Sequence, residues 1–187
     1  MVLSELKPRL ENLIQRPAQL LVEAGFTPNT LTVCGLLLSF VCFFVFGRGW
    51  ELLGGLLLLV CGFFDVMDGA VARLTGSETT FGGFLDSVVD RYSDFLVLAG
   101  MMVGKLTTLS WGLLAVLGSF MVSYTRARAE AAGSGKLAVG FAERGERLLI
   151  LSFFSLVGRA NFGVALVAIL ANLTALHRVL VAWDRLT

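Results

Sequence analysis

Four aspartates, Asp65, Asp68, Asp86 and Asp90, lie in a part of the chain that is otherwise strongly apolar. An aspartate at the centre of a membrane-spanning helix costs about 2.5 to 3.5 kcal/mol, so four of them need a compensating interaction. Divalent cations supply such compensation, and carboxylate oxygens are ligands that Mg²⁺ and Mn²⁺ prefer. The four residues therefore predict a metal site in an apolar environment.

The spacing of these aspartates indicates that they share helix faces. Asp65 and Asp68 lie three residues apart and Asp86 and Asp90 lie four apart, so each pair projects from one side of a helix. The connecting segment 74–81 is short, which predicts that the two helices are antiparallel neighbours. Four carboxylates would then converge on one site suited to two Mg²⁺ or Mn²⁺ ions that share ligands.

The composition places these helices in a membrane. The chain has 187 residues, of which 56% are hydrophobic and 16% charged, and its mean hydropathy is +0.81. These values are far from those of a soluble domain and predict a multi-pass membrane protein. Six apolar stretches follow one another, most of them near the roughly 20 residues needed to span a bilayer. They cover residues 30–46, 52–73, 84–104, 109–124, 147–158 and 162–182.

The expected fold is an all-α integral membrane protein with six transmembrane helices, preceded by an N-terminal interfacial amphipathic helix. At the N-terminus, apolar residues recur at helical spacing among charged ones, which is typical of a helix on the membrane surface. These apolar positions are Leu3, Leu6, Leu10, Leu13 and Ile14. We therefore expect residues 1–26 to form the interfacial helix and a linker, and residues 27–187 to form one six-helix domain.

The distribution of lysine and arginine predicts the orientation of the protein in the cell membrane. With six spans both termini face the same side, and most basic residues fall on that side. They are Lys7, Arg9, Arg16, Arg73, Arg126, Arg128, Lys136, Arg144, Arg147, Arg178 and Arg185. Arg48, Lys105 and Arg159 fall on the opposite side. The positive-inside rule then makes both termini and the metal site face the cytoplasm.

The remaining residues limit the other kinds of site. Cys34, Cys42 and Cys61 lie in apolar segments without C-x-x-C spacing, so we interpret them as packing residues. The single histidine, His177, cannot build a zinc site. The net charge is +1 and no basic stripe with interleaved aromatics occurs, so no nucleic-acid partner is expected.

An acidic-lined cation transporter is the alternative from another functional class, because rings of carboxylates also line ion pathways. A transporter accounts for the aspartates but not for Gly69, Arg73 and Gly82 on the same helix faces. One further aspartate, Asp94, can be explained as a structural ion pair with Arg91.

Segment 65–90 as a whole reads D-x₂-D-G-x₂-A-R-x₈-G-x₃-D-x₃-D and resembles the signature of the CDP-alcohol phosphatidyltransferase family at every fixed position. The resemblance extends over nearly the whole chain, since T-P-N-T-L-T at 27–32 is similar to the opening of the first span in that family. S-Y-T-R-A-R-A-E at 123–130 and A-E-R-G-E-R at 142–147 resemble the branch whose acceptor is inositol phosphate.

This resemblance implies a membrane enzyme with two Mg²⁺ or Mn²⁺ ions as cofactors. The enzyme would transfer a phosphatidyl-type group from a CDP-linked lipid, CDP-archaeol or CDP-diacylglycerol, to inositol phosphate and release CMP. Glycerol 3-phosphate and serine are the alternative acceptors within the family. Like its relatives, the protein would be a homodimer surrounded by membrane lipid.

The resemblance also implies roles for individual residues. Asp65 and Asp86 would bridge both metal ions, and Asp68 would complete the first metal site. Asp90 would bind the second ion and act as the general base. The CDP moiety would be contacted by Pro28, Asn29, Thr30, Leu31, Gly69, Arg73 and Thr79.

Three arginines are candidates for binding the phosphate of the acceptor. Arg126, Arg144 and Arg178 come from three predicted helices, all at the cytoplasmic end, and arginine suits bidentate phosphate recognition. The alternative is that they only obey the positive-inside rule. The resemblance to the inositol-phosphate branch favours the binding role.

Overall fold

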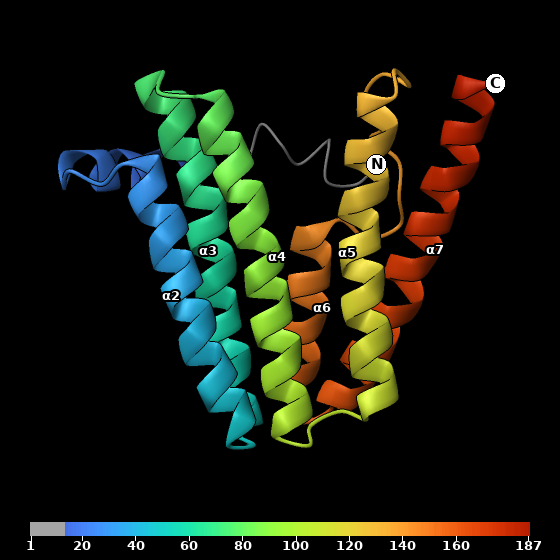
Figure 1. Ribbon diagram of the computed structural model, residues 1–187. Coiled ribbons are helices and arrows are strands. Elements are labelled where there is room, and N and C mark those ends of the chain that lie inside the picture. Colours follow the sequence, from blue (N-terminus) through green and yellow to red (C-terminus); the bar gives the residue numbers. More distant parts are fainter. Residues whose placement is uncertain (1–13) are drawn as a thin grey trace.

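The computed structural model describes residues 14–187, and within this part of the chain every regular element is a helix. Residues 14–23 are helical, and six longer helices follow (Figure 1). They are α2 (Pro28–Gly47), α3 (Glu51–Thr75), α4 (Thr80–Val103), α5 (Leu109–Ala131), α6 (Arg144–Leu156) and α7 (Ala160–Leu186). Each coincides with one predicted apolar stretch, so the prediction of an all-α fold is confirmed. Most of the predicted interfacial helix, from Leu3 to Leu13, lies outside the described residues.

Local capping interactions determine where the helices next to the aspartates begin and end. Thr27 and Thr30 form a capping box at the start of α2. Thr79 Oγ1 accepts a hydrogen bond from the backbone nitrogen of Gly82 at 2.9 Å and caps α4. Gly76 ends α3 with a φ of 60°, a left-handed conformation that favours glycine. These signals keep the connection between α3 and α4 short.

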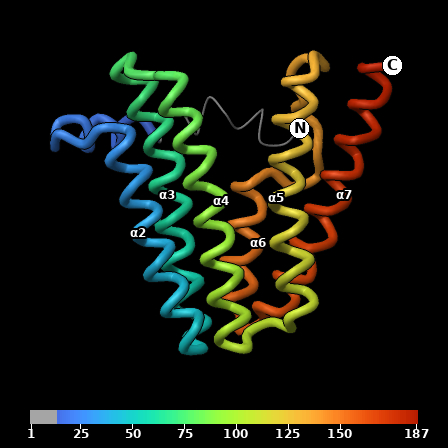
Figure 2. The backbone as a smooth tube through the Cα atoms, in the orientation of Figure 1, coloured from blue at the N-terminus to red at the C-terminus, as the bar shows by residue number. Residues whose placement is uncertain are grey.

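The helices form a bundle whose connections alternate between two ends (Figure 2). α2 packs against α3 and α4, α5 packs against α7, and α6 lies between α3 and α7. The α3–α4 connection, the α5–α6 connection and the C-terminus lie at the same end of the bundle (Figure 1). Helix α6 has only 13 residues and begins well below that end, which leaves a recess above it.

Helices α3 and α4 are antiparallel and lie side by side, as the short connection predicted (Figure 1), but few of their residues pack directly against each other. Each packs mainly against α2. A close approach of α2 to α4 depends on Gly100, where an added Cβ would lie 2.7 Å from the carbonyl oxygen of Phe43. The sides of α3 and α4 that face each other carry carboxylates, and burying these charges in tight helix packing would be unfavourable. The two helices therefore leave a polar space between their aspartates.

The main hydrophobic core joins all six long helices on the side of the carboxylates away from the α3–α4 connection. It includes Phe46, Leu58, Met101, Leu151 and Val164. Two of the cysteines, at positions 42 and 61, also belong to this core, and all three thiols are free. For these two cysteines, the interpretation as packing residues agrees with this placement, whereas Cys34 is only partly buried.

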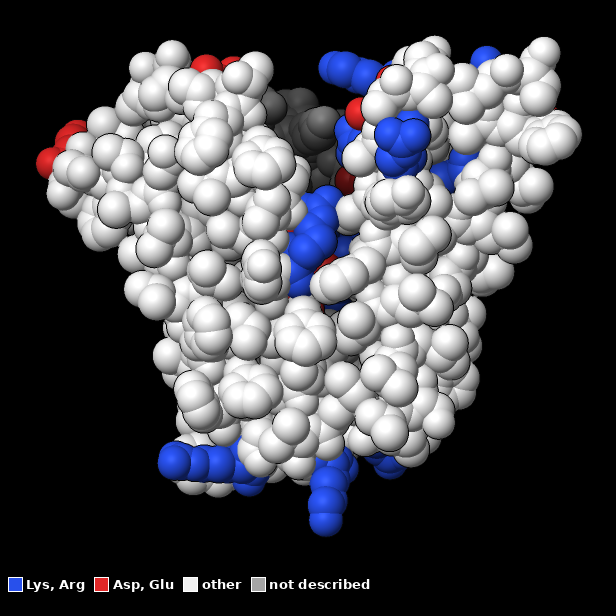
Figure 3. All heavy atoms as spheres, in the orientation of Figure 1, with Lys and Arg blue, Asp and Glu red and all other residues white. Residues whose placement is uncertain are grey.

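The exterior of the bundle is suited to lipid. Helices α2, α3 and α7 are each long and apolar enough to cross a membrane. Large apolar side chains such as Leu37, Phe44 and Leu113 point outward and are exposed. Figure 3 shows a broad belt of uncharged atoms, with lysine and arginine atoms gathered below it and in the recess above. An exposed apolar surface of this extent identifies a membrane protein.

Candidate metal and substrate site

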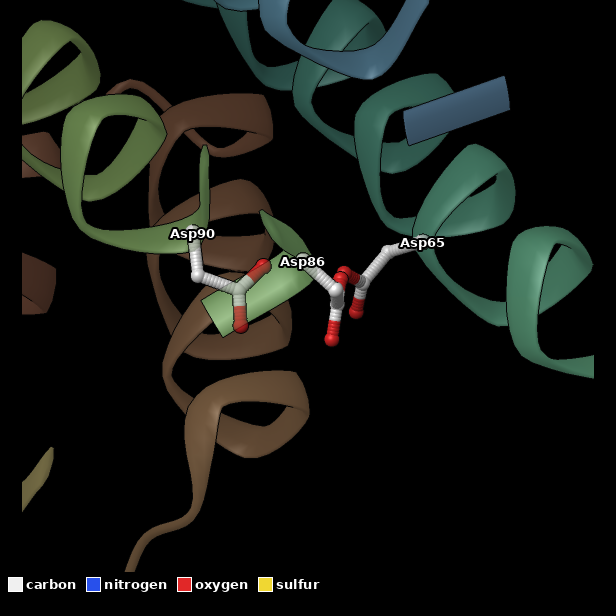
Figure 4. A group of neighbouring side chains, drawn as sticks. All are labelled: Asp65, Asp86 and Asp90. Atoms are coloured by element: carbon white, nitrogen blue, oxygen red, sulfur yellow. The ribbon is translucent and has the colours of Figure 1, made fainter. Parts of the chain in front are cut away.

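Three of the four predicted aspartates come together in the space between α3 and α4. Each of Asp65, Asp86 and Asp90 offers one carboxylate oxygen, and these oxygens lie within 4.8 Å of one another. Figure 4 shows the carboxylates of Asp65 and Asp86 pointing toward each other, with Asp90 one turn further along α4. All three are half-buried. We call these residues the carboxylate cluster, and their oxygen-only donor set fits a hard divalent cation.

The fourth aspartate, Asp68, lies one turn of α3 away from the cluster. Its Oδ2 accepts a hydrogen bond from Thr32 Oγ1 of α2 at 2.9 Å, and the residue is 8% exposed. Asp68 also lines the small polar space that contains Asp65, Asp86 and Asp90. The hydrogen bond from α2 orients its carboxylate toward both this space and a larger cavity beside it.

That larger cavity, which we call the glycine cavity, has a volume of about 280 Å³ and opens beside the α3–α4 connection. Helix α3 contributes Gly69 and α4 contributes Gly82 and Gly83, so backbone atoms form much of its wall. A wall without side chains lets a ligand approach the backbone closely. Four of the residues predicted to contact CDP line the cavity: Pro28, Asn29, Gly69 and Thr79.

The other three residues predicted to contact CDP do not line this cavity. Thr30 is exposed and takes part in the capping box of α2. Leu31 is fully buried and packs against Met67 and Val71. Arg73 is exposed, and its guanidinium lies along α3 above Gly69, where an added Cβ would be 3.3 Å from Arg73 Nη1. Arg73 therefore stands near the rim of the glycine cavity.

A second cavity lies on the opposite side of the carboxylate cluster, above the start of α6. It has a volume of about 430 Å³, and we call it the arginine cavity. The three predicted acceptor-binding residues, Arg126, Arg144 and Arg178, all line it. The structure therefore brings together three arginines from three different helices. The remaining lining residues are Ser87, Asp90, Arg91, Asp94, Val122, Ser123, Ala127, Glu130, Glu143 and Arg147.

Arg144 connects the arginine cavity to the carboxylate cluster. This first residue of α6 forms ion pairs with Asp65, with Asp90 at 2.8 Å and with Asp94 at 3.3 Å. Its side chain is 17% exposed. A guanidinium among three carboxylates offsets their mutual repulsion, so Arg144 is the main positive charge at the junction between the two cavities.

The expected ion pair between Asp94 and Arg91 is wrong. Arg91 Nη1 instead lies 3.2 Å from Asp90 Oδ2 and also donates to the backbone carbonyl of Ser87. Asp94 faces α6, where Arg144 and Arg147 both bind it. The expectation failed because proximity along one helix does not reveal the two arginines that a neighbouring helix presents.

Arg178 and Arg126 differ in how they are held. Arg178 is 2% exposed and donates to the carbonyl oxygens of Val122 at 2.6 Å and Val139 at 2.7 Å, so it ties α7 to α5 and to the α5–α6 connection. Arg126 is more exposed and pairs with Glu130 at 3.1 Å. Two nitrogens of Arg178 thus donate to backbone carbonyls, whereas Arg126 pairs with the half-buried side chain of Glu130.

Glu130 lies beyond the apolar part of α5 and anchors the connection to α6. Its carboxylate accepts a hydrogen bond from the backbone nitrogen of Leu137 at 2.9 Å and another from Arg126. These two contacts, the Leu137 hydrogen bond first, lower the pKa of Glu130 below its ordinary value. The carboxylate therefore stays charged and keeps the α5–α6 connection at the rim of the arginine cavity.

Sequence reasoning missed Arg147, which also lines the arginine cavity. A signal for it was present, because Arg147 lies three residues after Arg144 in the A-E-R-G-E-R segment and therefore shares its helix face.

The structure is that of a helical membrane protein in which a carboxylate cluster, whose donor set fits a hard divalent cation, lies between a glycine-walled cavity and an arginine-lined cavity. The chain matches the model of the CDP-alcohol phosphatidyltransferase family over residues 26–186, and it belongs to this family of enzymes.

Among similar proteins of known name are two archaetidylinositol phosphate synthases. The chain is 44% identical over 185 residues to the synthase of Pyrococcus horikoshii. This match covers 99% of this chain and 98% of the relative. It is 41% identical over 162 residues to that of Methanothermobacter thermautotrophicus, with 83% of each chain covered.

Crystal structures of Mycobacterium tuberculosis phosphatidylinositol phosphate synthase share the fold. The structure with CDP-DAG bound has a TM-score of 0.81 and 29% identity, and the match covers 92% of this chain and 94% of that chain. The complex with manganese and citrate has a TM-score of 0.82 and 30% identity, and the match covers 91% and 88%.

Proposed function

We propose that this enzyme transfers a phosphatidyl-type group from a CDP-linked lipid to inositol phosphate and releases CMP. One observation carries the proposal: the carboxylate cluster lies between a cavity with a glycine-rich wall and a cavity lined by arginines. Such an arrangement suits two anionic substrates that meet at a shared metal site. The names of the relatives, archaetidylinositol phosphate synthase and phosphatidylinositol phosphate synthase, support inositol phosphate as the acceptor.

The CDP moiety would occupy the glycine cavity. Gly69 allows close approach of phosphate groups to the backbone of α3, and Arg73 at the rim supplies a positive fork for phosphate oxygens. Pro28, Asn29 and Thr79 also line this cavity. Thr30 and Leu31 would contribute indirectly: Thr30 helps to cap α2 and Leu31 packs in the interior, and both thereby position the start of α2. The CDP-DAG complex of the mycobacterial relative supports this class of donor.

Asp65, Asp68, Asp86 and Asp90 would hold two divalent ions, Mg²⁺ or Mn²⁺, at the junction of the cavities. When bound, these ions would neutralise the charge that develops on the phosphate oxygens as CMP leaves. The manganese complex of the mycobacterial relative supports a divalent metal as cofactor, and the spacing of the carboxylate cluster supports its binding by these aspartates.

Asp90 would act as the general base because it belongs to the cluster and also lines the arginine cavity. A hydroxyl of the acceptor would lose its proton to the Asp90 carboxylate, and its oxygen would form a bond to the lipid-linked phosphorus. The bond between that phosphorus and the CMP oxygen would break, and CMP would leave with the electron pair. The acceptor phosphate would be held by Arg126, Arg144 and Arg178.

We further propose that all six long helices cross the membrane, with the recess above α6 and both termini facing the cytoplasm. The basic residues near the α3–α4 and α5–α6 connections support this orientation through the positive-inside rule. Residues 1–26 would form the interfacial helix and linker, and residues 27–187 the catalytic domain. The homodimer stays a prediction.

The test is CMP release by purified enzyme in lipid, measured with CDP-archaeol or CDP-diacylglycerol, Mg²⁺ and one acceptor at a time. We expect release with inositol phosphate and much slower release with glycerol 3-phosphate, serine or unphosphorylated inositol. Faster release with glycerol 3-phosphate or serine would reassign the acceptor. No release with any acceptor, combined with cation flux in vesicles, would favour the transporter instead.

A further inference from the structure

Asp94 forms a buried bridge between two arginines of α6 in the wall of the arginine cavity. Its side chain is only 9% exposed, and its two oxygens have different partners. Oδ1 accepts a hydrogen bond from Arg144 Nε at 3.3 Å, and Oδ2 accepts one from Arg147 Nη2 at 3.0 Å. One carboxylate on α4 therefore holds two guanidinium groups that belong to the same neighbouring helix.

The two arginines need a shared counter-ion in order to coexist. Arg144 and Arg147 lie three residues apart on α6, so they project from the same face toward α4. Arg147 is deeply buried, with 5% of its side chain exposed. Burying two like charges side by side is unfavourable unless an opposite charge pairs with both. Asp94 meets this requirement from the next turn of α4 after Asp90.

The bridge also fixes how each guanidinium is turned. Asp94 binds the Nε edge of Arg144, which leaves Nη1 to reach Asp65 and Asp90. Arg147 donates through Nη2 to Asp94 and through Nη1 to the carbonyl oxygen of Ala142 at 3.3 Å. Because each arginine is held at two or more points, both planar groups have a set orientation at the wall of the arginine cavity.

We propose that Asp94 is a positioning residue for the acceptor, and that it acts by bridging Arg144 and Arg147 so that the arginine cavity binds a phosphorylated alcohol in one orientation. The proposal rests on the proposed function. It assigns Asp94 to the acceptor and not to the lipid donor, because Asp94 lines the arginine cavity and is absent from the wall of the glycine cavity.

The decisive variant is Asp94→Asn, which keeps the shape of the side chain and removes its charge. We expect the KM for inositol phosphate to rise about tenfold or more, whereas the KM for the CDP-lipid should change less than about twofold. Asp94→Glu should recover part of the loss because it restores the charge. Thr107→Val is the matched control, since it removes another buried hydrogen bond, to Asn161 at the opposite end of the bundle, and should leave both KM values unchanged.

A double-mutant cycle tests whether Asp94 acts through Arg147. The Asp94→Asn/Arg147→Gln variant removes both charges of the pair, so it should fold even where the single Asp94→Asn variant is unstable. We expect the rise in its KM for inositol phosphate to be smaller than the two single effects combined, because only Arg144 is left for Asp94 to hold once Arg147 is replaced. Strictly additive effects, or equal rises in both KM values for Asp94→Asn, would overturn the positioning role.

A binding measurement separates this inference from the proposed function. Inorganic phosphate should raise the unfolding temperature of the wild-type protein and of Thr107→Val, but not that of Asp94→Asn. If wild type releases no CMP from a CDP-lipid while this pattern holds, the proposed function fails and the anion-positioning role of Asp94 stands. If wild type is active and phosphate stabilises Asp94→Asn equally, the role of Asp94 fails and the proposed function stands.

Discussion

Arg144 Nη1 lies 2.8 Å from Asp90 Oδ1, and this ion pair joins the first residue of α6 to the carboxylate cluster on α4. The same guanidinium lines the arginine cavity. A residue proposed to bind the acceptor and a residue proposed to remove its proton are therefore in direct contact. Substitutions at these positions should affect acceptor binding and chemistry in ways that kinetic measurements can separate.

Asp90→Asn should abolish transfer while weakening CDP-lipid binding only moderately. The substitution removes the proposed base, but Asp65, Asp68 and Asp86 keep their carboxylates. Turnover under saturating substrates, together with binding of a CDP-lipid, measures the two effects. Turnover close to that of wild type would contradict the assignment of Asp90.

Removal of divalent cations should eliminate activity. EDTA should stop CMP release, and added Mg²⁺ or Mn²⁺ should restore it. Ca²⁺ should restore it poorly, because its longer and looser coordination would misplace the phosphates of the donor. Asp65→Ala and Asp86→Ala should reduce activity as completely as EDTA does, since the family resemblance assigns each residue to both ions. Full activity after exhaustive chelation would exclude a metal-dependent reaction.

Glutamine substitutions of the three proposed acceptor-binding arginines should differ in a way that follows from their contacts. Arg144→Gln should raise the KM for inositol phosphate most, because a lost charge-assisted contact costs about 1.5 to 3 kcal/mol. Arg126→Gln should have the smallest effect, since Arg126 is more exposed and already pairs with Glu130. Equal, small changes in the KM of both substrates would instead mean that these arginines serve only membrane topology.

Arg178→Gln should lower stability as well as acceptor affinity. The wild-type side chain donates to two backbone carbonyls while buried, and its loss leaves both acceptors without that partner. An unsatisfied buried polar group costs about 1 to 3 kcal/mol. Thermal unfolding in detergent measures the loss, with Arg126→Gln as the exposed control. Unchanged stability would show that the α5–α6 connection does not depend on Arg178.

Gly100→Ala should destabilise the contact between α2 and α4. The added Cβ would meet the Phe43 backbone, which cannot move aside as a flexible side chain can, and overpacking typically costs about 1 to 3 kcal/mol. Gly62→Ala is the control within a helix, because the nearest atom to its added Cβ, on Leu148, is 3.9 Å away. A Gly62→Ala variant less stable than Gly100→Ala would contradict the packing argument.

Much of the fold and of the carboxylate cluster could be predicted because it depends on local pattern. Hydropathy located the six long helices, and helical spacing placed Asp86 and Asp90 on one face. Contacts between helices far apart in the sequence could not be predicted in this way. The close packing of α4 on α2 depends on Gly100, and the partners of Asp94 come from α6, fifty or more residues later.

Burial also separated residues that the family resemblance had grouped together. Thr30 and Leu31 are adjacent in the sequence, yet one caps a helix in an exposed position and the other is fully buried. A helix turns about 100° per residue, so neighbouring positions point in different directions and only the packing of α2 decides which side meets the cavity. The sequence could therefore predict which residues lie near the glycine cavity, but not which of them line it.

The 13 residues of α6 would span about 20 Å, whereas the hydrocarbon core of a bilayer is about 30 Å thick. With the C-terminal end of α6 at the far interface, its N-terminal end lies about two helical turns below the near interface. Arg144 is then at the bottom of the recess above α6. An acceptor bound by Arg144 would therefore lie about two helical turns below the membrane surface, beside the carboxylate cluster.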